Sequence, residues 1–225
     1  MGTGKIQLPA IQGWGAEQIS NALGGAALAN PVAIAVAIIA VLLSVSGTPY
    51  EDYFEGAQFI HFMLGPATVA LAAPLYSARR TVIRRWAPIA AALAAGSLAA
   101  MTSALALASL VGLPVEFFAS LAPKSTTAPV AIGVAERLGG SPTLTATLVI
   151  LTGVTGAVIA PALLTLMRVR DEAARGLALG VACHGIGAAR AFRESETTGA
   201  FAGIGLGANA VLTALLAPII LAFFL

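Results

Sequence analysis

The sequence predicts an all-α integral membrane protein, built as a multi-span helical bundle with inverted repeats, re-entrant hairpins and broken helices. Of its 225 residues, 58% are hydrophobic and only 10% are charged, whereas soluble domains have roughly 25% charged residues. Five intervals without a charged side chain are each long enough for the ~20 apolar residues of a membrane-spanning helix. Polar breaks rich in proline and glycine lie among them, and a bilayer tolerates such breaks mainly around a buried polar cavity.

The uncharged intervals extend over residues 19–50, 56–78, 86–115, 138–167 and 197–225. A β-barrel would need alternating apolar and polar positions along its strands. Runs such as residues 32–44 show no alternation, so we expect the spans to be helices in the lipid bilayer.

The N-terminal segment, residues 1–30, differs from the rest of the chain. It contains Lys5, Glu17 and several glycines but no long apolar stretch. It lacks the basic start and uninterrupted apolar core of a signal peptide. We therefore expect an exposed or interfacial lead-in, followed by one transmembrane domain over residues 31–225 whose first span lies near residues 31–46.

The charged loops predict the orientation. Arginine clusters at residues 79–85 and 168–175 are expected on the cytoplasmic side, and the acidic loop at residues 51–55 on the opposite side. Both ends of the segment between the spans 86–112 and 142–167 then lie on that opposite side. Its two apolar parts are too short to cross ~30 Å of hydrocarbon separately, which predicts a re-entrant hairpin with residues 123–129 at its tip. A broken helix pair that crosses completely would require one arginine cluster outside.

The following unit repeats this plan in the opposite sense. The long span 142–167 precedes a short apolar stretch, residues 176–183, and a polar, glycine-broken turn at residues 184–190. Residues 86–140 and 141–198 would thus be inverted repeats whose polar tips meet near the membrane midplane.

The chemistry of the two tips predicts a site for a small carboxylate. Freed amides at half-helix N-termini favour an anion, and Lys124 and Arg190 would add positive charge. Hydroxyl groups could hydrogen-bond a hydroxyl or carbonyl on the solute. The candidate solute-binding residues are Pro66, Thr68, Lys124, Ser125, Thr126, Thr127, Pro129, His184, Gly185, Gly187 and Arg190.

Four of these residues also have a structural explanation. Lys124 could extend to the interface, Arg190 could form a loop salt bridge or follow the charge bias of cytoplasmic loops, and Pro66 could be an ordinary kink. His184 could carry a proton or be a structural histidine bonded to a carbonyl.

Other functional classes lack their signatures. The basic residues lie in short loops, which does not indicate nucleic-acid binding. Two histidines and one cysteine without ligand spacing do not indicate a metal site, and we expect no cofactor. Paired acids and a serine–histidine pair are missing, and the adjacent Lys124 and Ser125 would not face each other on a helix. We therefore do not expect an enzyme.

Several motifs in fixed order resemble the LrgB/CidB family. From about residue 30 onwards they are Gly47-Thr48-Pro49-Tyr50, Leu64-Gly65-Pro66-Ala67-Thr68, Pro74-Leu75-Tyr76, Pro123-Lys124-Ser125, Arg175-Gly176-Leu177-Ala178, His184 with Gly187 and Arg190, and Gly199-Ala200-Phe201. Relatives tend to have valine at position 126 and threonine at positions 128 and 188, so this chain gains one hydroxyl and lacks two.

The resemblance implies two functions and a location. Members include antiholin-like regulators of murein hydrolases and autolysis that act with a small LrgA/CidA-type membrane subunit. A plant relative transports glycolate and glycerate in plastids, and bacterial relatives are linked to pyruvate uptake. The two hypotheses are a secondary transporter of small monocarboxylates that uses alternating access, and an antiholin-like regulator. Both imply a multi-pass protein of the bacterial cytoplasmic (inner) membrane, with assembly into a homo-oligomer left open.

Overall fold

The computed structural model describes residues 31–49, 52–53, 55–59, 62–63, 66, 76, 79–80 and 82–225. The expected lead-in, residues 1–30, and the candidate residue Thr68 lie outside the described residues. The chain divides into two compact units, Met1–Ala57 and Gln58–Leu225, and each is considered by itself.

The first unit contributes α2 (Pro31–Ser46), at the position expected for the first span. Its 16 residues are all apolar apart from two serines, and the serine hydroxyls bond within the helix or to its end.

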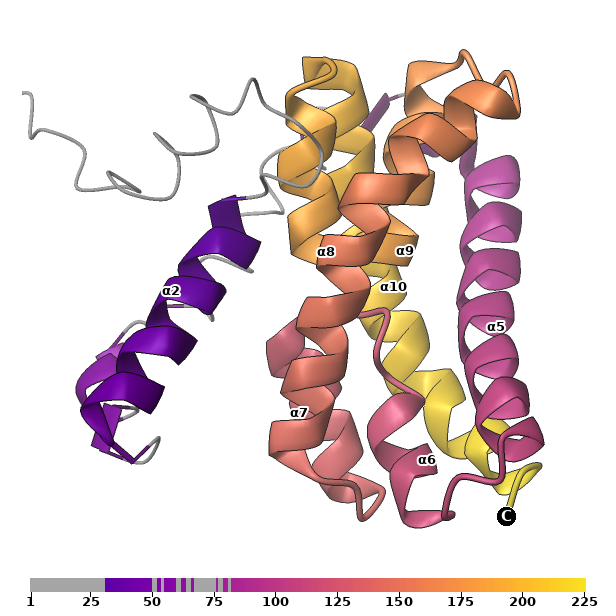
Figure 1. The fold of residues 1–225 in the computed structure, drawn as a ribbon. Coiled ribbons are helices and arrows are strands. Elements are labelled where there is room, and N and C mark those ends of the chain that lie inside the picture. Colours follow the sequence, from indigo (N-terminus) through magenta and orange to yellow (C-terminus); the bar gives the residue numbers. More distant parts are fainter. Residues whose placement is uncertain are drawn as a thin grey trace, which may run out of the picture. The chain divides into compact units, whose positions relative to one another are not determined.

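The second unit contains the helices that build the candidate site (Figure 1). They are α5 (Trp86–Leu110), α6 (Glu116–Leu121), α7 (Ala128–Arg137), α8 (Pro142–Leu166), α9 (Glu172–Phe192) and α10 (Glu196–Ala222). Of these, α5, α8 and α10 are long and apolar enough to span a membrane. The described residues include no strand, and the predicted all-helical membrane fold is confirmed.

The first hairpin consists of α6, the connecting residues 122–127 and α7. In a straight helix, residues 120 and 141 would be about 32 Å apart at 1.5 Å rise per residue. Instead, the Ser141 amide donates to Ser120 Oγ at 2.8 Å, and Thr145 Oγ1 donates to the Ser120 carbonyl at 3.2 Å. The chain therefore turns back on itself, with the Lys124 segment at the turn (Figure 1).

The second hairpin is α9 itself. The backbone of His184 has φ 44° and ψ −133°, which breaks the helix at that residue. Arg175 Nε lies 2.9 Å from Glu194 Oε2, although 19 residues of straight helix would span about 28 Å. The two ends of the hairpin therefore meet, and His184 forms its tip.

The position of this break corrects one prediction. The stretch 184–190 was expected to be a polar turn, but residues 185–192 continue as helix and only His184 leaves helical geometry. The glycines at 185 and 187 alternate with apolar residues that tolerate a helix, and a single residue with positive φ is enough to reverse the chain. Gly187 is needed for close packing, because a Cβ there would collide with the Leu179 carbonyl oxygen.

The two hairpins enter from opposite ends of the second unit. An ion pair of 3.7 Å between Arg85 and Asp171 places the start of α5 beside the α8–α9 loop. Both predicted cytoplasmic clusters therefore include residues at this same end. Since α5 leads away from it and α8 returns to it, the α6–α7 hairpin starts at the far end and α9 starts at the Arg85 end. Residues 86–140 and 141–198 thus share one plan, a long helix followed by a hairpin.

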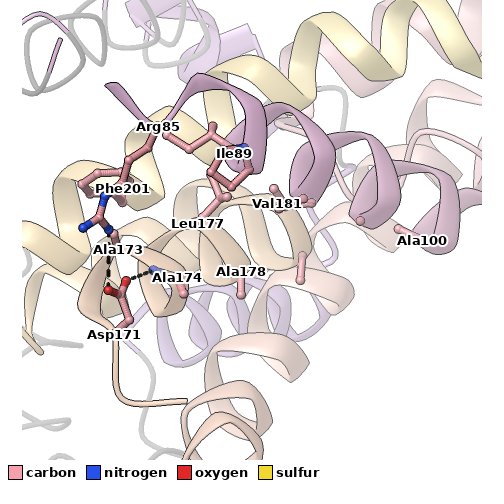
Figure 2. Close-up of a pocket in the computed structure, with 14 residues that line it drawn as sticks. Arg85, Ile89, Ala100, Asp171, Ala173, Ala174, Leu177, Ala178, Val181 and Phe201 are labelled. Atoms are coloured by element: carbon pink, nitrogen blue, oxygen red, sulfur yellow. Dashed lines mark hydrogen bonds and ion pairs between the residues drawn. The ribbon is translucent and has the colours of Figure 1, made fainter. Parts of the chain in front are cut away.

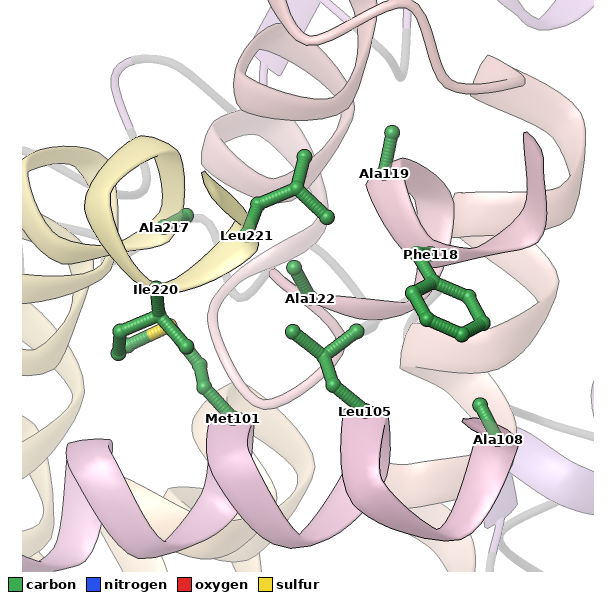
Figure 3. Close-up of a cluster of buried hydrophobic side chains, with 9 residues drawn as sticks. All are labelled: Met101, Leu105, Ala108, Phe118, Ala119, Ala122, Ala217, Ile220 and Leu221. Carbon is green, nitrogen blue, oxygen red and sulfur yellow. The ribbon is translucent and has the colours of Figure 1, made fainter. Parts of the chain in front are cut away.

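Apolar packing holds the first hairpin against the long helices. Phe118 and Ala122 join Leu105 of α5 and Ile220 and Leu221 of α10 in one buried cluster (Figure 3). Leu105 is fully buried. The cluster holds α6 and the start of the connecting segment against α5 and α10, which fixes the position of the tip.

Glycines allow α9 and α10 to pack backbone against backbone. A Cβ at Gly176 would collide with the Thr198 carbonyl oxygen, and one at Gly180 with the Ala202 carbonyl oxygen. On α10, by contrast, Gly207 is exposed and a Cβ there would have no neighbour within 4 Å. The space that lets the two helix backbones approach each other is therefore provided largely by the glycines of α9.

We expect Gly180→Ala to lower the free energy of unfolding by about 1–3 kcal/mol, because two backbones must separate to admit the methyl group. Thermal unfolding of the purified protein in detergent would measure this change. Gly207→Ala is the matched control and should be neutral or stabilising by roughly 0.5–1 kcal/mol, since a helical glycine is replaced in open space. Equal effects of the two substitutions would contradict the packing argument.

Candidate solute site at two facing hairpin tips

The first tip (residues 122–127) holds a cation in largely buried surroundings. Ser125 is 7% exposed and Thr126 is fully buried, while Lys124 is half-buried. Lys124 Nζ donates one hydrogen bond, to Ser125 Oγ at 3.2 Å. An ammonium group has three donors, so two remain for a ligand or water. Lys124 does not reach an acidic side chain among the described residues.

The second tip (residues 183–185) is held by α8. His184 is 5% exposed, and its Nε2 lies 2.9 Å from the Val149 carbonyl oxygen. A carbonyl only accepts, so Nε2 carries the hydrogen and donates it. This contact matches the structural alternative for His184 and leaves Nδ1 for another role. Gly153 makes room for the imidazole, because a Cβ there would lie 2.5 Å from Cε1.

The structure brings the two tips together. One side chain, Asn209 of α10, hydrogen-bonds the carbonyls of both Ser125 and Val181, although these two residues are far apart along the chain. Because the hairpins enter from opposite ends, their meeting point lies inside the bundle. The tip that carries the ammonium group is therefore held near the break in the other hairpin.

Asn209 of α10 links the first tip to the first half of the second hairpin. Its Nδ2 donates to the Ser125 carbonyl at 3.0 Å and to the Val181 carbonyl at 3.2 Å, and its Oδ1 accepts from Ser97 Oγ of α5. Asn209 is 1% exposed. The sequence interpretation missed this residue. Its signal was an amide side chain within an uncharged span, which is unusual in a membrane helix and marks a polar partner.

Of the remaining candidate residues, two lie at the first tip and the others do not. Thr127 and Pro129 begin α7, and the Thr127 side chain does not cap the helix, so the N-terminal amides of α7 point towards the first tip. Gly185 is exposed, and Arg190 lies in the last turn of α9. Six residues of helix place Arg190 about 9 Å along the axis from His184. Pro66 is exposed in a helical turn, and its position does not associate it with the tips.

Arg190 does not form the salt bridge that was considered for it. Glu194 instead pairs with Arg175, which donates from both Nε and Nη2 to the two carboxylate oxygens. Arg190 has no ion pair among the described residues. The part of the predicted site that the structure assembles is therefore Lys124, Ser125, Thr126, Thr127 and His184.

Thr126 is the polar group without a partner at the first tip. Its Oγ1 is the one buried side-chain oxygen or nitrogen, within the described residues, that makes no hydrogen bond. A buried hydroxyl without a partner costs roughly 1–3 kcal/mol. A hydroxyl in this state beside a cation with free donors is suited to a small polar anion.

A groove beside these helices has a different character. It is a groove of ≈540 Å³ between α5 and the first half of α9. Figure 2 shows Arg85 and Asp171 at one end and Ile89, Leu177 and Val181 along the wall. Its lining beyond the ion pair is apolar, which does not suit a carboxylate.

These features define the class: a multi-pass helical membrane protein in which two opposed re-entrant hairpins meet at a polar point. The chain belongs to the LrgB-like family, whose model matches residues 14–223. It is 36% identical over 194 residues to YwbG of Bacillus subtilis, covering 86% of each chain. It is 32% identical to the holin-like protein CidB of Staphylococcus epidermidis, covering 88% of this chain and 86% of the relative.

A third relative is the antiholin-like protein LrgB of Bacillus cereus, which is 31% identical over 87% of this chain and 85% of its own length. No solved structure matches the chain significantly. The resemblance to the LrgB/CidB family is therefore confirmed.

Proposed function

We propose that this chain is a secondary transporter of small monocarboxylates of the glycolate, glycerate and pyruvate class, located in a bacterial cytoplasmic membrane. The observation that carries the proposal is the link through Asn209 from the tip that holds Lys124 to the second hairpin, with two ammonium donors of Lys124 free. A bare cation is costly inside a bilayer. A carboxylate at this point would neutralise it and form charge-assisted hydrogen bonds.

The arrangement of the hairpins supports alternating access. Each hairpin enters from a different end of the bundle, and Asn209 joins the first tip to the first half of the second hairpin. Movement of this joined element against α5 and α8 would break the Ser97–Asn209 and His184–Val149 hydrogen bonds. It would expose the same point first to one side and then to the other. The terminal amides of α7 and the Lys124 ammonium would travel with the solute.

A second candidate function is antiholin-like regulation of murein hydrolase activity and autolysis, together with an LrgA/CidA-type membrane subunit. The names of the relatives support it, since two of them are called holin-like and antiholin-like. In this function the tip residues would be dispensable, because a partner surface rather than a bound solute would be required.

A ligand screen distinguishes the carboxylate transporter from the antiholin-like regulator. Purified protein in a neutral detergent would be melted with glycolate, glycerate, pyruvate, acetate and uncharged ethylene glycol at two pH values. A ligand that binds only the folded state stabilises it by about 2.7 kcal/mol at 100 times its Kd. We expect the carboxylates to raise the midpoint and ethylene glycol to leave it unchanged. If no acid raises the thermal midpoint, the proposed transport function is wrong.

Thr126→Val adds an isosteric variant to the same screen. The change removes the unpartnered hydroxyl, so stability without ligand should stay equal or rise. Binding of hydroxy and oxo acids should weaken by about 0.5–1.5 kcal/mol, the net contribution of one hydrogen bond. Thr145→Val is the control, because the Thr145 hydroxyl already bonds two carbonyls. It should lower stability and leave ligand preference unchanged.

A further inference from the structure

A polar cavity lies at the opposite end of the second hairpin from His184. It measures ≈450 Å³ and is formed by the end of α8, both ends of α9 and the start of α10. Arg168, Arg170 and Arg175 contribute guanidinium groups, and Thr165 and Thr198 contribute hydroxyls. Glu172 and Glu194 are the acidic residues of the lining. This cavity is separate from the tips and plays no part in the function proposed above.

The charges around the cavity do not balance. Arg175 is fully engaged, because it pairs with Glu194 and also donates to the Val169 carbonyl at 3.1 Å. Arg168 and Arg170 have neither an ion pair nor a hydrogen bond from their side chains among the described residues. The neighbouring Asp171 is taken by Arg85 and by the first turn of α9. Two guanidinium groups therefore face the cavity with Glu172 as the remaining acid.

Arg168 occupies a backbone position where arginine is unfavourable. Its φ is 59°, in the left-handed region that glycine adopts without strain. The Arg168 amide donates to the Thr165 carbonyl and the Val169 amide to the Leu164 carbonyl. This is the pattern of a helix C-terminus that usually carries glycine at the left-handed position. The loop would be more stable with glycine there, so the arginine side chain requires an explanation.

The tendency of cytoplasmic loops to be basic explains positive charge at this end. It does not explain why an arginine occupies the strained position 168. It also does not explain why the cavity is lined by the ordered Arg175–Glu194 ion pair. We propose that this cavity binds a phosphate group, carried either by a phospholipid headgroup at the membrane edge or by a free phosphorylated solute. Guanidinium groups bind phosphate through paired N–H donors. Arg168 and Arg170 together with Glu172 leave one positive charge in excess, which the single negative charge of a phospholipid phosphodiester would offset, while a free phosphomonoester carries nearly two negative charges at pH 7.

The test uses the full chain purified in a maltoside detergent, which contains no phosphate. Inorganic phosphate is added at constant ionic strength against chloride, and phosphatidylglycerol is added in a separate series. We expect at least one of them to raise the thermal midpoint of the wild type by about 2–4 °C. A response to inorganic phosphate indicates a site open to free phosphate, whereas a response to the lipid alone indicates a headgroup site.

Arg168→Gly distinguishes binding from folding. Because glycine suits the left-handed backbone, the midpoint of this variant without phosphate should equal or exceed that of the wild type, while the response to phosphate or lipid should be lost. Arg193→Ala is the matched control, since Arg193 is exposed beyond the end of α9 and does not line the cavity. It should keep the full response. The proposal is overturned if neither ligand stabilises the wild type, if Arg168→Gly responds fully, or if Arg193→Ala loses the response equally.

Discussion

Replacing Lys124 with alanine is expected to abolish carboxylate uptake by proteoliposomes while leaving folded protein in the membrane. The ammonium group is half-buried and has one protein acceptor, Ser125 Oγ. Removing one member of a buried, hydrogen-bonded charge pair costs about 2–5 kcal/mol of binding. That loss corresponds to at least roughly 30-fold in apparent affinity. Stability should not fall, because the variant no longer buries a positive charge.

Arg137→Ala is the control for this experiment. Arg137 ends α7, so the substitution removes one positive charge from the base of the same hairpin and leaves the tip intact. It should retain uptake of glycolate, glycerate and pyruvate close to the wild-type rate. If Lys124→Ala liposomes take up these acids as fast as the wild type, the site is wrongly assigned. If neither protein transports any acid, the regulatory function is favoured.

Replacing Asn209 with leucine should produce the largest loss of stability. The change leaves the Ser125 and Val181 carbonyls and the Ser97 hydroxyl without their partner. Hydrogen bonds between membrane helices contribute roughly 0.6–1.7 kcal/mol each, so we expect a decrease of about 2–5 kcal/mol in the free energy of unfolding. Denaturation in mixed micelles, followed by circular dichroism, would measure it.

Thr213→Val provides the comparison on the same helix. Thr213 is buried at 3% exposure, one turn further along α10, and its side chain does not bridge helices. This substitution should change stability by less than about 1 kcal/mol. A similarly small effect at Asn209 would show that the tips are held together by packing alone, and the link through the amide would then be unimportant.

Local features of the chain were predictable because each rests on a short stretch of residues. The spans at α2, α5, α8 and α10 follow from apolar length, and their observed bounds lie close to the expected ones. The break around Pro123 follows from two prolines flanking polar residues. The second break was located less well, since the motif from His184 to Arg190 looks like a turn whereas only His184 departs from helical geometry.

The composition of the site depends on contacts between distant segments. The role of Asn209 requires α10 to pass both Ser125 and Val181. The approach of His184 requires Gly153 on α8, and the exclusion of Arg190 from the tip follows from the number of helical residues after the break. None of these relations appears in a motif, because each pairs residues that are tens of positions apart.

The amino-acid sequence alone was sufficient for the class of protein, the spans and the two polar interruptions, because the cost of placing charge and unpaired backbone in lipid acts locally. The tertiary structure decided which interrupted segments face each other and which polar groups remain without a partner. Hydrogen bonds and close packing between helices select one arrangement among many that would bury the same apolar surface, and that selection placed the tip that carries Lys124 near the second hairpin.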